Sequence, residues 1–140
     1  MNPVKKTQPS KIQKIKKPNI PIDLITLNAS GEILGRLSTK VAILLRGKDL
    51  ANFQPNIICR RRVVVLNAGQ IKTTGKKMNQ KMYYRHSGYL GNLKSQTMAE
   101  IYKKNPAKIL ELAVWGMLPK NKLRKVWMRN LQIYNGEKDA

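Results

Sequence analysis

Acidic side chains are scarce in this sequence, and their scarcity limits what the protein can do. Seven aspartates and glutamates stand against 28 lysines and arginines in 140 residues, which gives a formal charge of +21. A small free-standing domain usually carries a net charge of about 2 to 8 in magnitude, so the sequence predicts an acidic partner. Residues 50–99 contain no acid at all. A metal-dependent nuclease needs clustered carboxylates, and the sequence offers no such cluster.

Cysteine and histidine are almost missing as well. The single Cys59 excludes an internal disulfide and a thiolate metal cluster, and it suits a reducing, cytosol-like compartment. The single His86 has no acid or cysteine at metal-ligand spacing, so we expect no metal site, no cofactor and no catalytic residue. No apolar run reaches 18 residues and the mean hydropathy is -0.45, which argues against a membrane span.

Residues 1–21 differ in composition from the rest of the chain. They contain six lysines, four prolines and no acid, a composition that supports neither a helix nor a packed core. We interpret them as a basic arm that is disordered or becomes ordered on RNA, with a solvated tail and an organelle transit segment as alternatives. Residues 22–140 are enough for a single domain with one sizeable core.

Two apolar segments predict buried parallel strands. Residues 22–27 and 63–66 are mostly aliphatic or β-branched, as strands covered on both faces are. Gly47 lies where the C-cap of an intervening helix would fall. The apolar residues at helical spacing before it are Leu34, Leu37, Val41, Leu44 and Leu45. The strand, helix, strand order predicts an α/β fold, and the Asn-Ala pair that ends each strand is best explained as a turn former.

The sequence of the second half of the chain predicts two further short strands and three helices. Residues 81–86 form the first candidate strand. Thr97 and Glu100 have the spacing of a capping box, and Asn105 followed by Pro106 is typical of a helix start. The remaining predicted features are a break at residues 116–119, a basic helix over about residues 120–129 and a closing strand over residues 131–134.

Residues 69–76 look like a phosphate-binding loop but lack its spacing. Five residues separate the two glycines where a Walker A motif has four, and Lys77 follows where serine or threonine would bind magnesium. We therefore predict no nucleotide site in this loop.

The acid-free interval is rich in side chains that contact RNA. Its nine cations are interspersed with tyrosines and the histidine; lysine and arginine contact phosphates, and aromatic rings stack on bases. A membrane suits this pattern less, because the sequence has neither a basic amphipathic helix nor a lipid-anchor signal. The sequence therefore favours nucleic acid as the partner.

Several sequence blocks occur in the order known from one protein family. They are Leu34-Gly35-Arg36-Leu37, Lys81-Met82-Tyr83-Tyr84-Arg85-His86-Ser87-Gly88-Tyr89, Leu93-Lys94, Gly116-Met117-Leu118-Pro119-Lys120, and the series Arg129, Leu131, Ile133, Tyr134, Gly136. The tyrosine-histidine block is the most specific of them. Over residues 22–136 the chain resembles the bacterial-type L13 family of large-subunit ribosomal proteins.

This resemblance implies a three-layer α/β/α fold around a four-stranded, mostly parallel sheet. It implies a structural role in the large ribosomal subunit, where the protein would bind and stabilise rRNA early in assembly and so support translation. The implied partners are large-subunit rRNA and neighbouring ribosomal proteins, in the cytoplasm or, as an alternative, in an organelle. It implies no cofactor, membrane, small-molecule substrate or homo-oligomer.

The candidate RNA contacts combine family positions with the cationic interval. By position, the family's first-helix basics, its characteristic loop and its last basic residues all have counterparts here. The predicted set is Arg36, Lys40, Arg46, Lys48, Arg60, Arg61, Arg62, Lys76, Lys77, Lys81, Tyr83, Tyr84, Arg85, His86, Ser87, Tyr89, Lys94, Lys120, Lys122, Arg124, Lys125 and Arg129. Packing is the alternative role for the three tyrosines, and Met117, Leu118 and Trp127 are expected in the core.

Two stretches depart from the family pattern. Residues 60–62 are all arginine where acids or glycine are usual, and Asn121, Lys122, Arg124 and Lys125 stand where glycine and proline are common. The chain is therefore more cationic than the pattern it resembles. An mRNA regulator on the same scaffold and a small basic nuclease are the alternative functions.

Overall fold

A computed structural model describes residues 23–137 of the chain. The predicted basic arm, residues 1–21, lies outside these residues. The elements, in chain order, are β1 (Asp23–Asn28), α1 (Leu34–Arg46), β2 (Arg61–Leu66), the 3-10 turn η1 (Ala68–Gln70), α2 (Lys77–Gln80), β3 (Met82–His86), β4 (Leu93–Thr97), α3 (Met98–Lys104), α4 (Pro106–Met117), α5 (Arg124–Arg129) and β5 (Leu131–Ile133).

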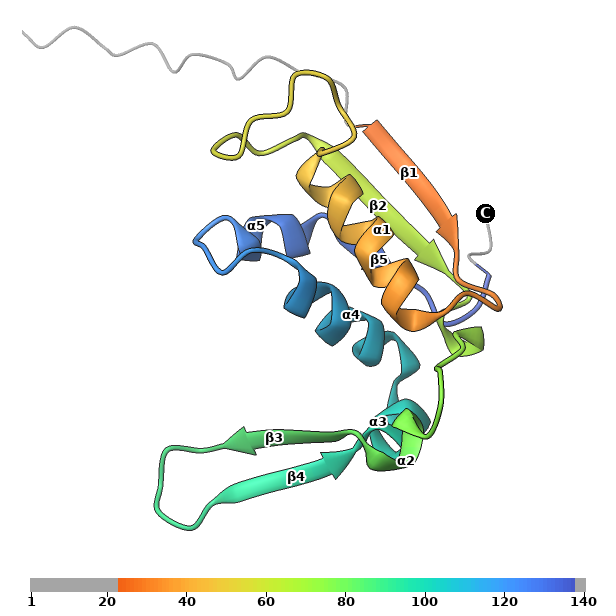
Figure 1. Cartoon of the computed structure of the whole chain (residues 1–140), viewed down its shortest axis with the longest axis vertical. Coiled ribbons are helices and arrows are strands. Elements are labelled where there is room, and N and C mark those ends of the chain that lie inside the picture. The colour runs from red at the N-terminus through yellow and green to blue at the C-terminus, as the bar shows by residue number, and fades with distance from the viewer. Residues whose placement is uncertain (1–22, 138–140) are drawn as a thin grey trace, which may run out of the picture.

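The main sheet has three parallel strands in the order β1-β2-β5 (Figure 1). Val63 at its centre pairs with Ile25 on β1 and with Leu131 on β5. The strand predictions at residues 63–66 and 131–134, and at the described part of residues 22–27, are confirmed. Asparagine is the turn former at both strand ends: Asn67 adopts a φ of 59° and its amide donates to Asn28 Oδ1 at 3.2 Å.

The predicted four-stranded sheet is not confirmed, because the described residues contain no fourth parallel strand. Instead, β3 and β4 pair antiparallel with each other as a separate two-stranded sheet, which projects from the body of the molecule (Figure 1). The cause is local. Gly88 and Gly91 in the connection have φ values of 99° and 74°, which glycine adopts without steric cost, so the chain reverses and satisfies β3 with its neighbour in sequence.

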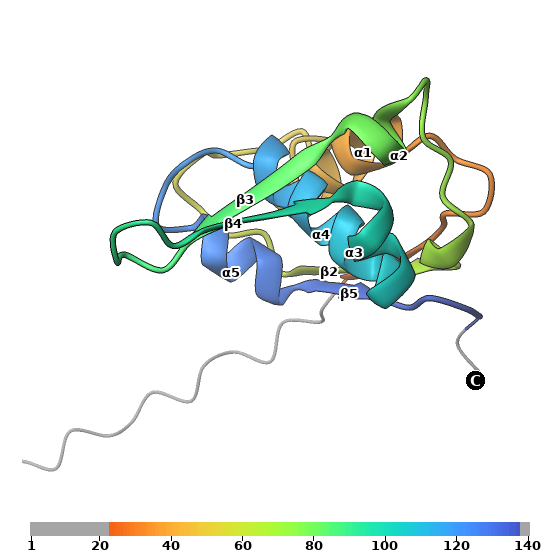
Figure 2. The ribbon, with the colours of Figure 1, turned by 90° about the horizontal axis from the view of Figure 1, so that it is seen from below.

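The helices α1 and α4 lie on one side of the main sheet (Figure 2). Val63 and Val65 are buried on this side. Because strand residues alternate between faces, Leu24, Thr26, Arg62 and Val64 lie on the opposite side. Val64 on the central strand is buried, and the other three are exposed. The described residues thus form two layers, not the three predicted, since none of their helices covers the second face.

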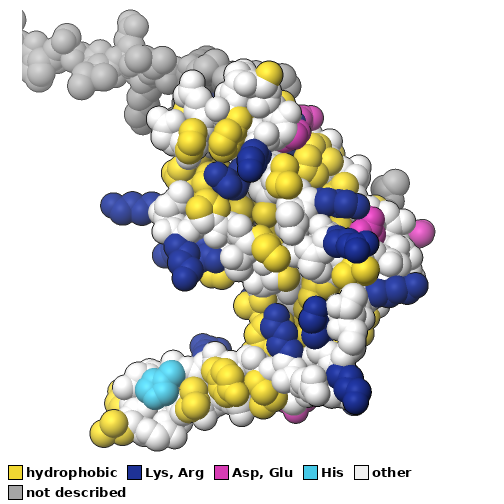
Figure 3. Space-filling model, viewed as in Figure 1, with side chains coloured by type: hydrophobic (Ala, Val, Ile, Leu, Met, Phe, Trp, Pro, Cys, Tyr) yellow, Lys and Arg dark blue, Asp and Glu magenta, His cyan; other side chains and the backbone are white. Residues whose placement is uncertain are grey.

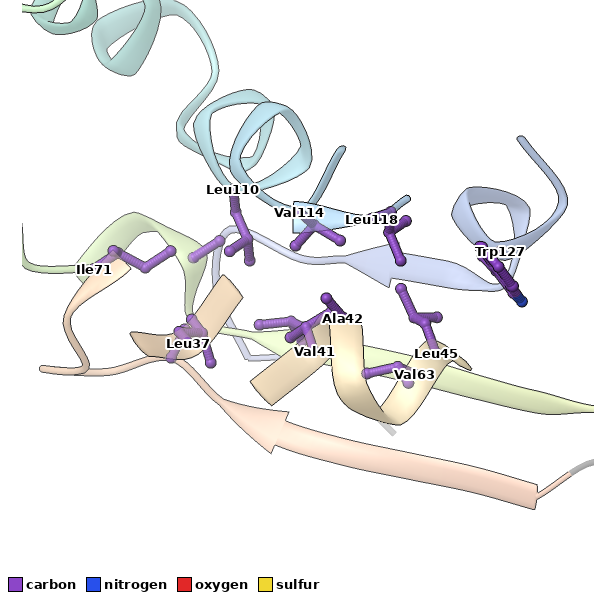
Figure 4. Close-up of a cluster of buried hydrophobic side chains, with 13 residues drawn as sticks. Leu37, Val41, Ala42, Leu45, Val63, Ile71, Leu110, Val114, Leu118 and Trp127 are labelled. Atoms are coloured by element: carbon purple, nitrogen blue, oxygen red, sulfur yellow. The ribbon is translucent and has the colours of Figure 1, made fainter. Parts of the chain in front are cut away.

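The core lies between α1, α4 and the sheet (Figure 4). The large buried side chains of the two helices recur at a spacing of four residues, which keeps them on one stripe of each helix. The stripes are Leu37, Val41 and Leu45 on α1, and Leu110 and Val114 on α4, continued by Leu118 directly after the helix. Trp127 of α5 closes one end of the core and is 1% exposed.

The helix ends form as the sequence predicts. Gly47 has a φ of 72° and donates its N–H to the carbonyls of Ile43 and Leu44. Thr97 Oγ1 accepts the N–H of Glu100 at 3.3 Å, and Asn105 Oδ1 accepts the N–H of Ala107 at 3.1 Å. The predicted last helix is shorter than expected. It begins at Arg124 because Asn121 first makes a turn, with its Oδ1 accepting the Arg124 N–H at 3.1 Å.

A buried arginine ties three segments together. Arg61 on β2 is 5% exposed, and its guanidinium donates to Asp23 on β1 at 2.9 Å and to Asp49 in the loop after α1 at 2.7 Å. Hydrogen bonding with Asp49 raises the pKa of Arg61. The same hydrogen bond lowers the pKa of Asp49. The pair therefore stays charged under ordinary conditions and anchors the start of the sheet.

Replacement of Leu110 tests how far the stability of the fold depends on the core. Leu110→Ala removes a fully buried side chain and leaves a cavity, so we expect the free energy of unfolding to fall by about 2 to 5 kcal/mol. Urea denaturation measures it. The matched control is Leu90→Ala at the tip of the hairpin, where the leucine is fully exposed and the expected change is within about 0.5 kcal/mol. Equal losses in the two variants would contradict the assigned core.

Replacement of Asp49 tests the clamp on Arg61. We expect Asp49→Asn to lower the free energy of unfolding at pH 7 by about 2 kcal/mol, as for other hydrogen bonds to charged groups. The pKa of Asp49 is lower in the folded protein. Its stabilisation is therefore complete above the unfolded pKa and is lost as pH falls through the folded pKa. Urea denaturation from pH 7 downward should show the two proteins converging below about pH 4; a constant difference would refute the clamp.

Candidate nucleic-acid interface

The β3–β4 hairpin has two chemically different faces. Directly opposed residues in a two-stranded sheet share a face, so the register divides the hairpin residue by residue. Tyr83 opposes Gln96 and Arg85 opposes Lys94 on one face, here called the cationic face. The other, here called the apolar face, carries Met82 opposite Thr97, Tyr84 opposite Ser95, and His86 opposite Leu93.

The cationic face places two like charges opposite each other. Arg85 and Lys94 are both exposed, and like charges directly opposed across a sheet destabilise it. Next to them, the Lys81 ammonium lies 5.2 Å from the centroid of the Tyr83 ring, which holds a third cation against the base of the hairpin. An anion placed between these side chains removes the repulsion, so the arrangement favours binding of phosphate groups.

The apolar face is open to solvent. Tyr84 is 66% exposed and Leu93 is 61% exposed, and Figure 3 shows hydrophobic side chains and the histidine on this part of the molecule. The connecting loop adds Tyr89 and Leu90, both strongly exposed. RNA contact and packing within the chain were the two roles predicted for Tyr83, Tyr84 and Tyr89. Only Tyr83 is partly buried by the rest of the chain, whereas Tyr84 and Tyr89 are exposed.

His86 ends β3, and Ser87 begins the connection to β4. His86 Nδ1 accepts the N–H of Gly88 at 2.9 Å, so one imidazole nitrogen is used within the turn. Ser87 is exposed beside it. His86 therefore lies on the apolar face and Ser87 in the connection after it, and the RNA contact predicted for both stays a prediction.

A cleft of about 660 Å³ lies where the hairpin meets the body. Its walls come from the start of α1, from α2 and from the second half of α4, and they include Gly35, Leu112 and Met117. Lys77 and Lys81 line the same cleft, and none of its lining residues is acidic. Met117 is 51% exposed, so its predicted core position is wrong, whereas Leu118 and Trp127 are buried as predicted.

The predicted first-helix cations are divided among different roles. Arg36 is exposed near the start of α1. Lys40 forms an exposed ion pair with Glu32 at 2.9 Å. The Arg46 guanidinium lies between two aromatic rings, 5.5 Å from the centroid of Phe53 and 5.9 Å from that of Trp127, so it serves packing. Lys48, after the helix, is exposed.

The three consecutive arginines do not act as one patch. Arg60 and Arg62 are exposed, but Arg61 points inward to its two aspartates. Arg61 therefore cannot serve as the surface RNA contact predicted from the sequence. Alternation along β2 explains the difference, because side chains of successive strand residues point to opposite faces.

The remaining predicted cations surround a tryptophan that the sequence reasoning missed. Lys120, Lys122 and Lys125 are exposed around Trp115, and the Arg124 guanidinium lies 4.2 Å from the centroid of a Trp115 ring. The helical pattern gave a usable signal, because Trp115 falls outside the buried stripe of α4. Further cations outside this group, Lys76 and Arg129, are also exposed.

The described residues, 23–137, hold neither a candidate metal site nor a candidate membrane span. No group of three or more histidine, cysteine, aspartate and glutamate side chains there could hold a metal ion. Within the same range, no helix is both long and apolar enough to cross a bilayer.

Comparison with known proteins gives a consistent family. The model of the family described as "Ribosomal protein L13" matches residues 23–140. The chain is 45% identical to the large ribosomal subunit protein uL13 of Thermosipho africanus over 134 residues, which cover 96% of this chain and 87% of the relative. It is 46% identical to uL13 of Syntrophobacter fumaroxidans and 47% identical to that of Helicobacter hepaticus, each over 112 residues covering 80% of this chain and 79% of the relative. The chain belongs to the ribosomal protein L13 family.

Proposed function

We propose that this protein is a structural constituent of the large ribosomal subunit that binds and stabilises large-subunit rRNA, in the cytoplasm. The family is a structural, non-enzymatic one, and the chain is not an enzyme. The observation that carries the proposal is the cationic face of the hairpin, where Arg85 directly opposes Lys94 within a 50-residue interval free of acids. Binding of a polyanion to this face would neutralise the repulsion between its positive charges.

The proposed contact relies mainly on phosphates. Arg85, Lys94 and Lys81 project from the hairpin and its base, and Lys77 extends the same charge into the adjoining cleft. Phosphate contacts position a protein without reading sequence, which suits a component that stabilises a folded RNA. The cations would neutralise RNA segments that otherwise repel one another as the rRNA folds. The protein would therefore bind early in subunit assembly.

The apolar face is assigned to a neighbouring ribosomal protein. Tyr84, Leu93 and Met82 present apolar surface without a lysine or arginine among them, so this face attracts phosphate poorly. A hairpin with one face on RNA and the other on a protein would connect the two. The protein itself enters the subunit as one copy, since a second copy would repeat the same positive charge.

The first prediction of this function concerns sedimentation. In a lysate run through a sucrose gradient in magnesium buffer, we expect the chain to migrate with the large subunit at close to one copy per subunit. We expect it to remain there after a high-salt wash, because a component enclosed by folded rRNA is held by many simultaneous contacts. A loosely bound polycation provides the control, since counterion competition removes it at high salt. Recovery mainly at the top of the gradient would refute a structural role.

Replacement of Lys94 on the cationic face should affect RNA binding and stability in opposite directions. Lys94→Glu replaces the like-charge pair with an opposite-charge pair across the strands, so the free protein should gain about 0.2 to 1 kcal/mol in stability. Affinity for a large-subunit rRNA fragment should fall, and the slope of log affinity against log salt should decrease by about 1 for each lost phosphate contact. Urea denaturation and a filter-binding salt series measure the two effects.

A matched control removes the same charge elsewhere. Lys103 is exposed on α3 and lies outside the proposed interface, so Lys103→Glu changes the net charge equally. We expect it to weaken RNA binding much less than Lys94→Glu. Equal weakening by both variants would mean that only net charge matters and that the cationic face is not the contact.

A further inference from the structure

We propose that the hollow between the end of α4 and the start of α5 is a stacking site for an unpaired nucleobase of RNA. The inference rests on the proposed function, since it names an additional contact to the same kind of ligand. The hollow has a volume of about 380 Å³ and is lined by Trp115, Lys120, Asn121, Lys122, Arg124 and Lys125. It lies apart from the hairpin, on a different part of the chain.

The floor of the hollow is a preformed cation-on-ring stack. The Arg124 guanidinium carbon lies 4.2 Å from the centroid of a Trp115 ring, a distance typical of a planar group resting on an aromatic face. Trp115 remains 38% exposed. The second arginine of this kind, Arg46, is 5.9 Å from Trp127, which is 1% exposed, so that pair belongs to the core and offers no platform.

The stack is held in place before any ligand arrives. Asn121 fixes the turn that leads to Arg124, because its Oδ1 and its main-chain carbonyl both accept the Arg124 N–H, at 3.1 Å and 3.2 Å. Arg124 Nε is buried and has no hydrogen-bond partner in the described protein. The arginine is thus positioned by the stack and the turn, and its side chain is not committed to an acid.

The charge around the stack is of one sign. Lys120, Lys122 and Lys125 are exposed at the rim of the hollow. None of the lining residues is acidic, and Glu111, one turn before Trp115 on α4, is paired with Lys108 at 2.7 Å. Three lysines at the rim of an arginine-tryptophan platform are available to contact the phosphates next to a stacked base.

These features together favour single-stranded RNA over a duplex. An unpaired base exposes its face and stacks on aromatic rings or guanidinium planes, whereas a base inside a duplex does not. The flanking lysines then neutralise the phosphates on either side of that base. We therefore assign to this hollow a base in a loop or bulge of the RNA.

The experiment measures binding of the full chain to an unstructured 12-nucleotide RNA and to a duplex of the same length. Trp115→Leu should weaken binding to the single strand by about tenfold, as expected for the loss of one base stack, and should change duplex binding little. Trp115→Phe keeps an aromatic face and should bind close to wild type. Circular dichroism and thermal melting establish that both variants are folded.

Tryptophan emission and a charge-conserving variant give two independent readouts. The chain has two tryptophans, so Trp115→Phe leaves only the buried Trp127. Single-stranded RNA should quench the wild-type emission and leave that of Trp115→Phe nearly unchanged. Arg124→Lys keeps the charge but loses the planar group, so it should weaken single-strand binding while the salt dependence stays the same.

The outcomes distinguish this inference from the proposed function. If Trp115→Leu binds the single strand as tightly as wild type, or if wild-type emission is not quenched, the stacking site is refuted even though the protein binds large-subunit rRNA. If wild type binds neither RNA nor ribosomal subunits, the proposed function itself fails. Equal losses for single strand and duplex would also overturn the site, because they indicate a purely electrostatic contact.

Discussion

Repulsion among the lysines and arginines is the constraint to which the rest of the structure responds. The few acids serve mainly the fold: Asp23 and Asp49 neutralise the buried Arg61, Glu32 pairs with Lys40, and Glu111 pairs with Lys108. Folding therefore depends on apolar packing between α1, α4 and β2, together with one internal charge cluster. The hairpin and the α4–α5 junction have no such neutralisation from the side chains that line them, and these are the surfaces that we assign to RNA.

Features set by neighbouring residues could be predicted from the sequence. The stripe of Leu37, Val41 and Leu45 follows from helical spacing, and the helix ends at Gly47 and Thr97 follow from the geometry of a left-handed cap and a capping box. The short strand at residues 81–86 was also found, as β3. In each case the decisive hydrogen bonds or contacts link residues close together in the chain.

Features that depend on contacts between residues far apart in the chain could not be predicted from the sequence. The sequence does not say whether β3 joins the parallel sheet or pairs with β4, because either arrangement satisfies its backbone. Residues 60–62 are all arginine and cannot be told apart from the sequence. The register of β2 nevertheless turns Arg61 inward to Asp23 and Asp49. Trp115 was not among the predicted site residues, because its role in the proposed site depends on contact with Arg124, which lies on the next helix. The family resemblance identified the family but not these particular side-chain placements.

The order of the main sheet has a consequence for how the chain folds. β5 is separated from β2 along the chain by the hairpin and the helices α2 to α5, and closing so long a loop costs entropy before any contact compensates for it. Until then β2 presents an unpaired backbone edge next to apolar side chains, the condition under which partly folded chains associate. The large positive charge acts against this hazard, since unfinished copies of the chain repel one another. The same charge that is suited to an RNA partner thus protects the protein while this long-range pairing forms.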